Sequence, residues 1–194
     1  AISECENIYD NKFFPNLKLR YLEIIIINLN SIPILYVNEI GFKKYYSKEE
    51  VIHKVNLVAK YLRSIGVKKG DRVVGIVTNN AETLISFLAV NSIGAVWSSC
   101  SPDFGEQAIL DRFSQIEPKI LFCSSNYMYG GKKFKILEKI KNVESKLNTL
   151  EVSICIDYSQ KDKSFIDEKL NFFEENNRES VSYTHLRAHE TQQH

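Results

Sequence analysis

The 194-residue sequence predicts an α/β protein: a partial doubly wound parallel sheet preceded by a β-hairpin. From Gly70 to Phe122, short apolar strands alternate with helical segments. The strand 72–77 is apolar on both faces, as expected of a central strand that is covered by helices on two sides. The connections are short, so right-handed crossovers would give a single sheet.

The segment before the sheet gives weaker signals. We expect residues 1–30 to form an irregular segment, in which only the aromatic group before Pro15 stands out. Two β-rich runs, 32–37 and 42–46, flank a turn at 38–41 and predict a β-hairpin.

The alternating part begins with a helix over 47–65. Ser47 and Glu50 form a capping box, and Gly66 stands where helices commonly end. The further predicted elements, in chain order, are strand 72–77, helix 82–93, strand 95–99, helix 106–116, strand 119–124, helix 132–147 and strand 151–158. The helix 132–147 is predicted to be basic and amphipathic.

The chain divides by composition into an α/β subdomain over 31–158 and two later segments. Residues 159–180 are polar and charged, which predicts poor order. Residues 181–194 hold three of the four histidines and resemble a translated sequencing-adapter artefact, so they are left out of the fold prediction. A metal-binding pair at His185 and His189 is the alternative, but no acidic or cysteine partner accompanies it.

Composition excludes several classes of protein. The 25 basic and 24 acidic side chains give a net charge of +1, so no bias toward nucleic acid or membranes follows. The longest apolar run, 24–27, is far shorter than the roughly 18 residues of a membrane span. Four separated cysteines without a CxxC pair argue against a zinc site or disulfide framework. We expect reduced thiols, no metal site and a cytoplasmic protein, and we expect the chain to start inside a longer one.

Two stretches are too particular to be generic loop and helix. They are Trp97-Ser-Ser-Cys-Ser-Pro-Asp-Phe-Gly105 and Asp111-Arg-Phe-Ser-Gln-Ile116. Together with Gly66-Val-Lys-Lys-Gly-Asp-Arg-Val-Val-Gly75, they resemble the acetoacetate–CoA ligases, a branch of the adenylate-forming acyl-CoA ligases. The resemblance runs from Phe13 to about Asp157, and Cys100 stands where the family usually has Thr.

The resemblance implies a two-step ligase. ATP and acetoacetate would give an acyl-adenylate and pyrophosphate, and CoA would then displace AMP. The parent enzyme would use ATP, CoA and Mg²⁺, with acetoacetate as its small-molecule substrate. The family's phosphate-gripping loop and C-terminal lysine have no counterpart in this sequence, and no GxxxxGK[ST] motif occurs. We therefore expect no catalytic residue here, no tight binding of these cofactors and an inactive fragment.

The first candidate site is the loop of Pro102, Asp103, Phe104 and Gly105. It follows a predicted parallel strand and opens a helix, and both places favour anionic ligands. The resemblance places this loop near the CoA nucleotide. The structural alternative is that Pro102 and Gly105 shape a turn while Asp103 caps the helix.

The second candidate is Lys132 with Lys133, which follow the glycine pair 130–131 and could meet the CoA phosphates. The alternative, a solvated basic start of a helix, is favoured. Three other features have structural predictions: 78–80 as a helix-capping turn, and Trp97 and Cys100 as buried side chains. Arg112 is predicted to be ion-paired.

A stand-alone flavodoxin-like domain, binding a nucleotide or serving in regulation or interaction, is the alternative function. The glycines at 66, 70 and 75 do not have the GxGxxG spacing that would support a dinucleotide site.

Overall fold

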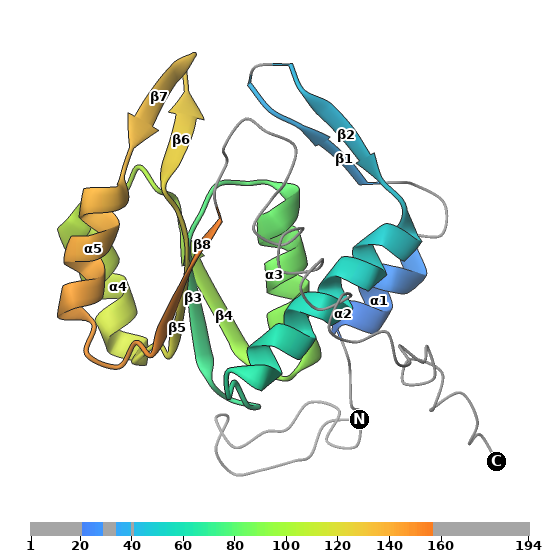
Figure 1. Ribbon diagram of the computed structural model, residues 1–194, viewed down its shortest axis with the longest axis horizontal. Coiled ribbons are helices and arrows are strands. Elements are labelled where there is room, and N and C mark those ends of the chain that lie inside the picture. The colour runs from blue at the N-terminus through green and yellow to red at the C-terminus, as the bar shows by residue number, and fades with distance from the viewer. Residues whose placement is uncertain (1–20, 29–33, 40, 157–194) are drawn as a thin grey trace, which may run out of the picture.

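The computed structural model describes residues 21–28, 34–39 and 41–156. The predictions for 159–180 and 181–194 lie outside these residues. Figure 1 shows the described part as a central sheet with helices on both sides and two hairpins at one end.

The sheet consists of four parallel strands in the order β4-β3-β5-β8. They are β3 (Arg72–Ile76), β4 (Val96–Cys100), β5 (Ile120–Ser124) and β8 (Val152–Ile156). Strand β3 has neighbours on both sides and is almost wholly buried, which explains its apolar residues on both faces. The predicted parallel sheet is confirmed.

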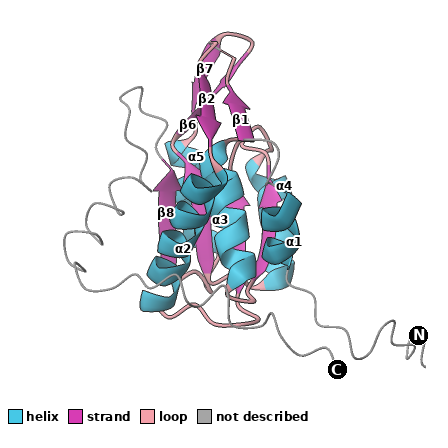
Figure 2. Ribbon diagram, turned by 90° about the vertical axis from the view of Figure 1, so that its right-hand side faces the viewer, coloured by secondary structure: helices cyan, strands magenta, loops and turns pink. Residues whose placement is uncertain are grey.

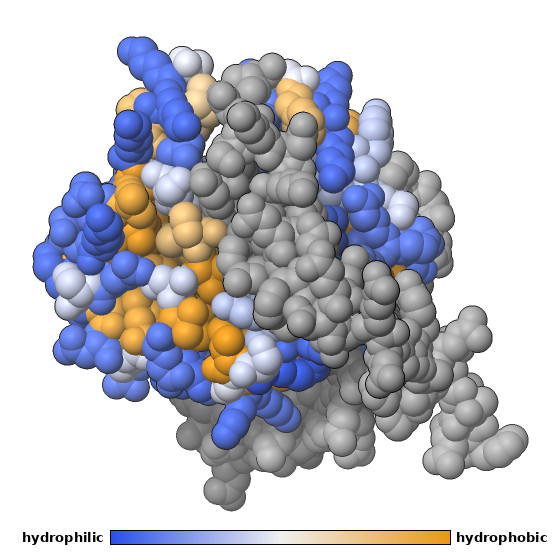
Figure 3. Space-filling view, viewed as in Figure 1, coloured by the Kyte–Doolittle hydropathy of each residue, from blue (hydrophilic) through white to orange (hydrophobic). Residues whose placement is uncertain are grey.

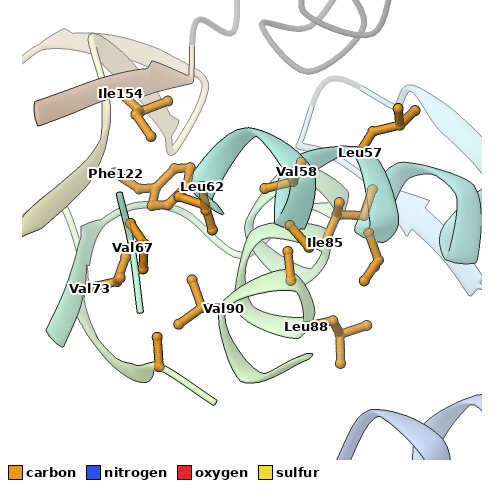
Figure 4. Packing of buried hydrophobic residues seen from close by; sticks show 14 of the residues in the cluster. Leu57, Val58, Leu62, Val67, Val73, Ile85, Leu88, Val90, Phe122 and Ile154 are labelled. Carbon is orange, nitrogen blue, oxygen red and sulfur yellow. The ribbon is translucent and has the colours of Figure 1, made fainter. Parts of the chain in front are cut away.

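Helices cover both faces of the sheet. On one face lie α2 (Lys48–Ser64) and α3 (Ala81–Ser92), with α1 (Tyr21–Asn28) against α3. On the other lie α4 (Glu106–Phe113) and α5 (Leu137–Lys146). Alternate residues of β3 and β5 enter two separate apolar clusters, one beneath each helix layer. Figure 4 shows Leu62 of α2, Phe122 of β5 and Ile154 of β8 meeting in the first of them. The doubly wound architecture is therefore confirmed.

Two antiparallel hairpins complete the fold. The first joins β1 (Ile34–Val37) to β2 (Lys43–Tyr46), as predicted. The second joins β6 (Asn126–Tyr129) to β7 (Lys132–Lys135). Both project from the same end of the molecule, as Figure 2 shows from the side.

Two sequence predictions are wrong in these regions. Residues 21–28 form helix α1, although 1–30 was expected to be irregular. The helix predicted over 132–147 is a strand followed by a shorter helix, because the glycines at 130 and 131 take φ angles of 57° and 72° and close a hairpin. The apolar face of α5 is consequently built from Ile136, Ile140 and Val143, and Leu137 is exposed.

The helix ends follow the sequence signals. Ser47 Oγ accepts a hydrogen bond from the Glu50 amide at 3.1 Å, which caps α2. Gly66, with φ of 85°, follows Ile65, the C-cap residue of that helix. The helix predicted over 106–116 stays α-helical to Phe113 and continues as a short 3₁₀ turn, Ser114–Ile116. Within the described ranges, every helix is too short or too polar to cross a bilayer.

Candidate functional site

The carboxyl ends of all four parallel strands meet at one edge of the sheet. The loop 101–105 leaves β4 at this edge and opens α4, and the β6–β7 hairpin follows β5 directly. Ligands in open α/β folds bind at this edge. In Figure 1 both hairpins stand at this end, and the Gly131 amide donates to the Glu39 carboxylate across them at 3.5 Å.

The first predicted group, Pro102 to Gly105, forms this exposed loop. Pro102 is buried, whereas Asp103, Phe104 and Gly105 face solvent. Gly105 is the N-cap residue of α4, and no side chain caps the helix there. The reading of Asp103 as the cap is therefore wrong. The amide groups in the first turn of α4 remain the groups that could meet an anionic ligand.

A lysine of α5, which the sequence did not predict as part of the site, binds the backbone of the loop 101–105. Lys139 Nζ, from α5, donates hydrogen bonds to the carbonyl oxygens of Pro102 at 2.6 Å and Phe104 at 2.9 Å. A signal for it exists: Lys139 falls on the same helical face as the buried Ile136 and Val143. A lysine within an apolar face needs polar partners nearby, and two backbone carbonyls supply them.

Phe104 has a second contact in the loop region. The guanidinium of Arg112 lies 5.6 Å from the centroid of the Phe104 ring, a cation–π arrangement. Across the described ranges, no carboxylate forms the ion pair predicted for Arg112.

The second predicted pair, Lys132 and Lys133, lies on β7 and not at a helix start. Both side chains are exposed. Successive residues of a strand point to opposite faces, so the two ammonium groups leave the hairpin in opposite directions. Among the described residues, neither lysine hydrogen-bonds to the 101–105 loop.

The side chains and carbonyl of the turn at 78–80 form hydrogen bonds within the turn and with the first residues of α3. Asn80 Oδ1 accepts from the Thr83 amide at 2.6 Å, and Asn80 Nδ2 donates to Thr78 Oγ1 at 3.3 Å. Thr83 Oγ1 donates to the Thr78 carbonyl at 2.8 Å. The helix-capping reading of this turn is confirmed.

The burial predicted for Cys100 is confirmed, and Trp97 packs with the core without being fully buried. Trp97 is partly buried and packs against the first core cluster, with the rings of Phe87 and Phe122 at centroid distances of 6.3 and 5.7 Å. Cys100 is 8% exposed. Burial raises the pKa of its thiol to about 11, so Cys100 stays protonated at neutral pH and is a poor nucleophile.

Side chains of α4 and α5 form hydrogen bonds with each other at the N-terminus of α4. Glu106, the first residue of α4, accepts hydrogen bonds from Lys146 and Asn142 of α5. These two bonds lower the pKa of the Glu106 carboxyl below its usual 4.5. Lys139 and Lys146 thus hold the N-terminus of α4 and its preceding loop against one helix.

The described part of the chain contains no group of three or more His, Cys, Asp or Glu side chains arranged to hold a metal. The backbone N–H groups in the first turn of α4 are the groups at this loop that favour an anion.

The model of the AMP-binding enzyme family matches residues 34–191, and the chain belongs to that family. It is similar to acetoacetyl-CoA synthetase from Mus musculus, with 48% identity over 110 residues, covering 57% of this chain and 16% of the relative. The acetoacetyl-coenzyme A synthetase of Rhizobium meliloti (strain 1021) is 34% identical over 155 residues, covering 79% of this chain and 24% of the relative.

A solved structure shows the same fold. The acetoacetyl-CoA synthetase from Streptomyces lividans superposes with a TM-score of 0.74 and 34% sequence identity, over 79% of this chain and 24% of that one. The chain therefore spans between 16% and 24% of the length of these relatives.

Proposed function

We propose that this chain is the N-terminal portion of an acetoacetate–CoA ligase. The parent enzyme joins acetoacetate to ATP as an acyl-adenylate with release of pyrophosphate, and the CoA thiol then displaces AMP. The observation that carries the proposal is the joint agreement of sequence and backbone with acetoacetyl-CoA synthetases over 79% of the chain. The parent enzyme works in the cytoplasm with ATP, CoA and Mg²⁺.

Within that enzyme, this portion supplies scaffold and part of the CoA-binding surface. The first turn of α4 presents backbone N–H groups beside the 102–105 loop, and such groups attract phosphate. Phe104 is 37% exposed and carries a cation against its ring, so it offers a stacking face for a base. These features favour a nucleotide that carries both phosphates and an aromatic base.

Lys132 and Lys133, two of the three lysines of β7, make separable contributions. Because Lys132 and Lys133 point to opposite faces of the hairpin, only one of them can meet a given phosphate group. Its ammonium would form a charge-assisted hydrogen bond that the other cannot replace. The adenylation step, with its phosphate loop and metal, is assigned to the remainder of the parent enzyme.

The test separates the two half-reactions in the product of the gene's full reading frame. Phe104→Ala should raise the KM for CoA about tenfold, the equivalent of about 1.4 kcal/mol. Replacement of whichever of the two lysines binds the phosphate should have the same effect. The rate of acetoacetate-dependent pyrophosphate exchange, which needs no CoA, should stay unchanged. Lys132→Gln and Lys133→Gln are compared separately, and Lys135→Gln on the same strand is the matched control.

The outcome decides both parts of the proposal. A raised KM for CoA without change in pyrophosphate exchange supports the assigned surface. An unchanged KM for CoA in Phe104→Ala, Lys132→Gln and Lys133→Gln would show that CoA does not bind to this surface. Absence of any acetoacetate-dependent activity in the parent protein would overturn the ligase assignment itself.

A further inference from the structure

A single row of side chains crosses the sheet at the level of Ile76. Register pairs Ile76 of β3 with Cys100 of β4 and with Cys123 of β5, and Cys123 in turn with Cys155 of β8. All four side chains belong to the cluster beneath α4 and α5. Three of the chain's four cysteines therefore lie in one line, and the proposed ligase chemistry uses none of them.

Cys123 and Cys155 are direct neighbours in this row. Adjacent strands lie about 4.8 Å apart, and disulfides join residues whose Cα atoms are roughly 4.4–6.8 Å apart. The two side chains share a face and are joined by a hydrogen bond between the thiols. Cys100 is separated from Cys123 by the whole of β3, about 10 Å, which is beyond the reach of a disulfide.

The two thiols differ in access. Cys123 is 3% exposed, whereas Cys155 is only partly buried and belongs to β8, at the edge of the described sheet. The hydrogen bond with Cys155, and then burial, raise the pKa of Cys123. Figure 3 shows apolar surface beside α5 and β8. Because Cys155 is the more exposed of the two thiols, a small uncharged oxidant reaches it before Cys123.

We propose that Cys123 and Cys155 form a dithiol modification site, which a peroxide closes to an intrachain disulfide and a small dithiol reopens. In the first step the Cys155 sulfur is oxidised by hydrogen peroxide to sulfenic acid, and one water leaves. In the second step Cys123, which stays protonated but is held beside Cys155 by the strand register, passes its proton to the departing hydroxyl as its sulfur attacks the sulfenic sulfur, so that the S–S bond forms and a second water leaves. Two thiols lose two electrons, and one peroxide gains them.

The disulfide would cross-link β5 to the edge strand β8 through two residues that lie opposite each other. Its formation depends on the folded sheet, because only the native register places these two cysteines side by side. It does not depend on the proposed ligase function, and it is tested on the 194-residue chain itself.

The experiment treats the purified chain with hydrogen peroxide, blocks remaining thiols with a maleimide at acidic pH and maps tryptic peptides without reduction. Trypsin places Cys123 in peptide 120–132, Cys155 in peptide 147–161 and Cys100 in peptide 73–112. We expect one cross-linked species that joins the first two peptides, an intact mass lower by two hydrogen atoms, and its loss on treatment with dithiothreitol.

Matched variants make the result decisive. Cys155→Ser and Cys123→Ser should abolish the cross-link, whereas Cys100→Ser should retain it. Circular dichroism verifies that each variant is folded, and Cys155→Ala replaces Cys155→Ser if that variant unfolds. Cross-links that involve Cys100, a cross-link that persists without Cys155, or oxidation of Cys155 to sulfinic acid without any cross-link would each overturn the proposal.

Discussion

Lys139 Nζ lies 2.6 Å from the carbonyl oxygen of Pro102, and it bonds the Phe104 carbonyl as well. The loop 101–105 is thus held by a helix that follows it by more than thirty residues. Lys139→Met keeps the side-chain length and removes both bonds. It should cost about 1 kcal/mol of stability and speed amide exchange in 101–105.

Hydrogen–deuterium exchange read by mass spectrometry measures this effect peptide by peptide. Lys141→Met is the control, since Lys141 is exposed and pairs with Glu138 on the same helix. Equal exchange in the loop for both variants would show that Lys139 does not hold it.

Gly75 is a close-packed position in the central strand. A Cβ there would lie 2.9 Å from Trp97 Cζ2 and 3.1 Å from Val77 Cγ2, and the Trp97 ring is packed between Phe87 and Phe122. Gly75→Ala should therefore destabilise the fold by about 1–3 kcal/mol. Since Trp97 is the single tryptophan, urea unfolding followed by its fluorescence measures the change directly.

Gly105→Ala is the matched substitution for that experiment. Nothing lies within 4 Å of a Cβ at Gly105, and its φ of −62° suits alanine. Its cost should stay below about 1 kcal/mol, which reflects only a weaker N-cap. A Gly75→Ala variant as stable as this control would contradict the packing described for Trp97.

The pair of Glu106 with Lys146 predicts a pH dependence. The folded-state pKa of Glu106 is lowered, first by the Lys146 hydrogen bond and then by that of Asn142. Stability from such a carboxyl is present above its unfolded pKa and is lost as the pH falls through the lower, folded pKa. Between about pH 5 and about pH 3, the urea midpoint should fall more steeply in the native chain than in Glu106→Gln.

Glu138→Gln serves as the comparison, because Glu138 is 86% exposed and pairs with Lys141 at the surface. It should keep the slope of the native chain. Identical slopes for all three proteins would mean that the contact between α4 and α5 contributes nothing over this pH range.

Cys100 provides a test of burial near the site. With its pKa raised to about 11, its thiol should be alkylated by iodoacetamide at pH 8 far more slowly than in the urea-unfolded chain, by at least about tenfold. Peptide mapping reports the alkylation of each cysteine separately. Equal rates in the folded and unfolded states would contradict the buried position of Cys100.

The parallel sheet could be predicted because its central strands consist of apolar residues on both faces. Val73, Val74 and Ile76 leave no polar face, and Gly66 ends the preceding helix at a positive φ. Such local signals agree with the fold, so each element could be placed within a few residues. The caps at Ser47 and Asn80 followed for the same reason.

The β6–β7 hairpin was missed because its strand signal is weak. The run Lys-Lys-Phe-Lys is fully exposed and has little apolar content, while Phe134 falls at helical spacing from the residues of α5. The glycine pair at 130–131 was the informative feature, since two residues at positive φ suit a two-residue hairpin turn. Lys139 could be recognised as a support for the loop only once the packing of α5 against it was known.

We propose that this chain carries the scaffold and part of the CoA surface of an acetoacetate–CoA ligase, and that the adenylation step needs the longer protein. Acetoacetate-dependent release of pyrophosphate from ATP tests it most directly, measured side by side for the 194-residue chain and for the product of the gene's full reading frame. We expect turnover by the longer protein and none by this chain. Turnover by the 194-residue chain alone, or none by the longer protein, would contradict it.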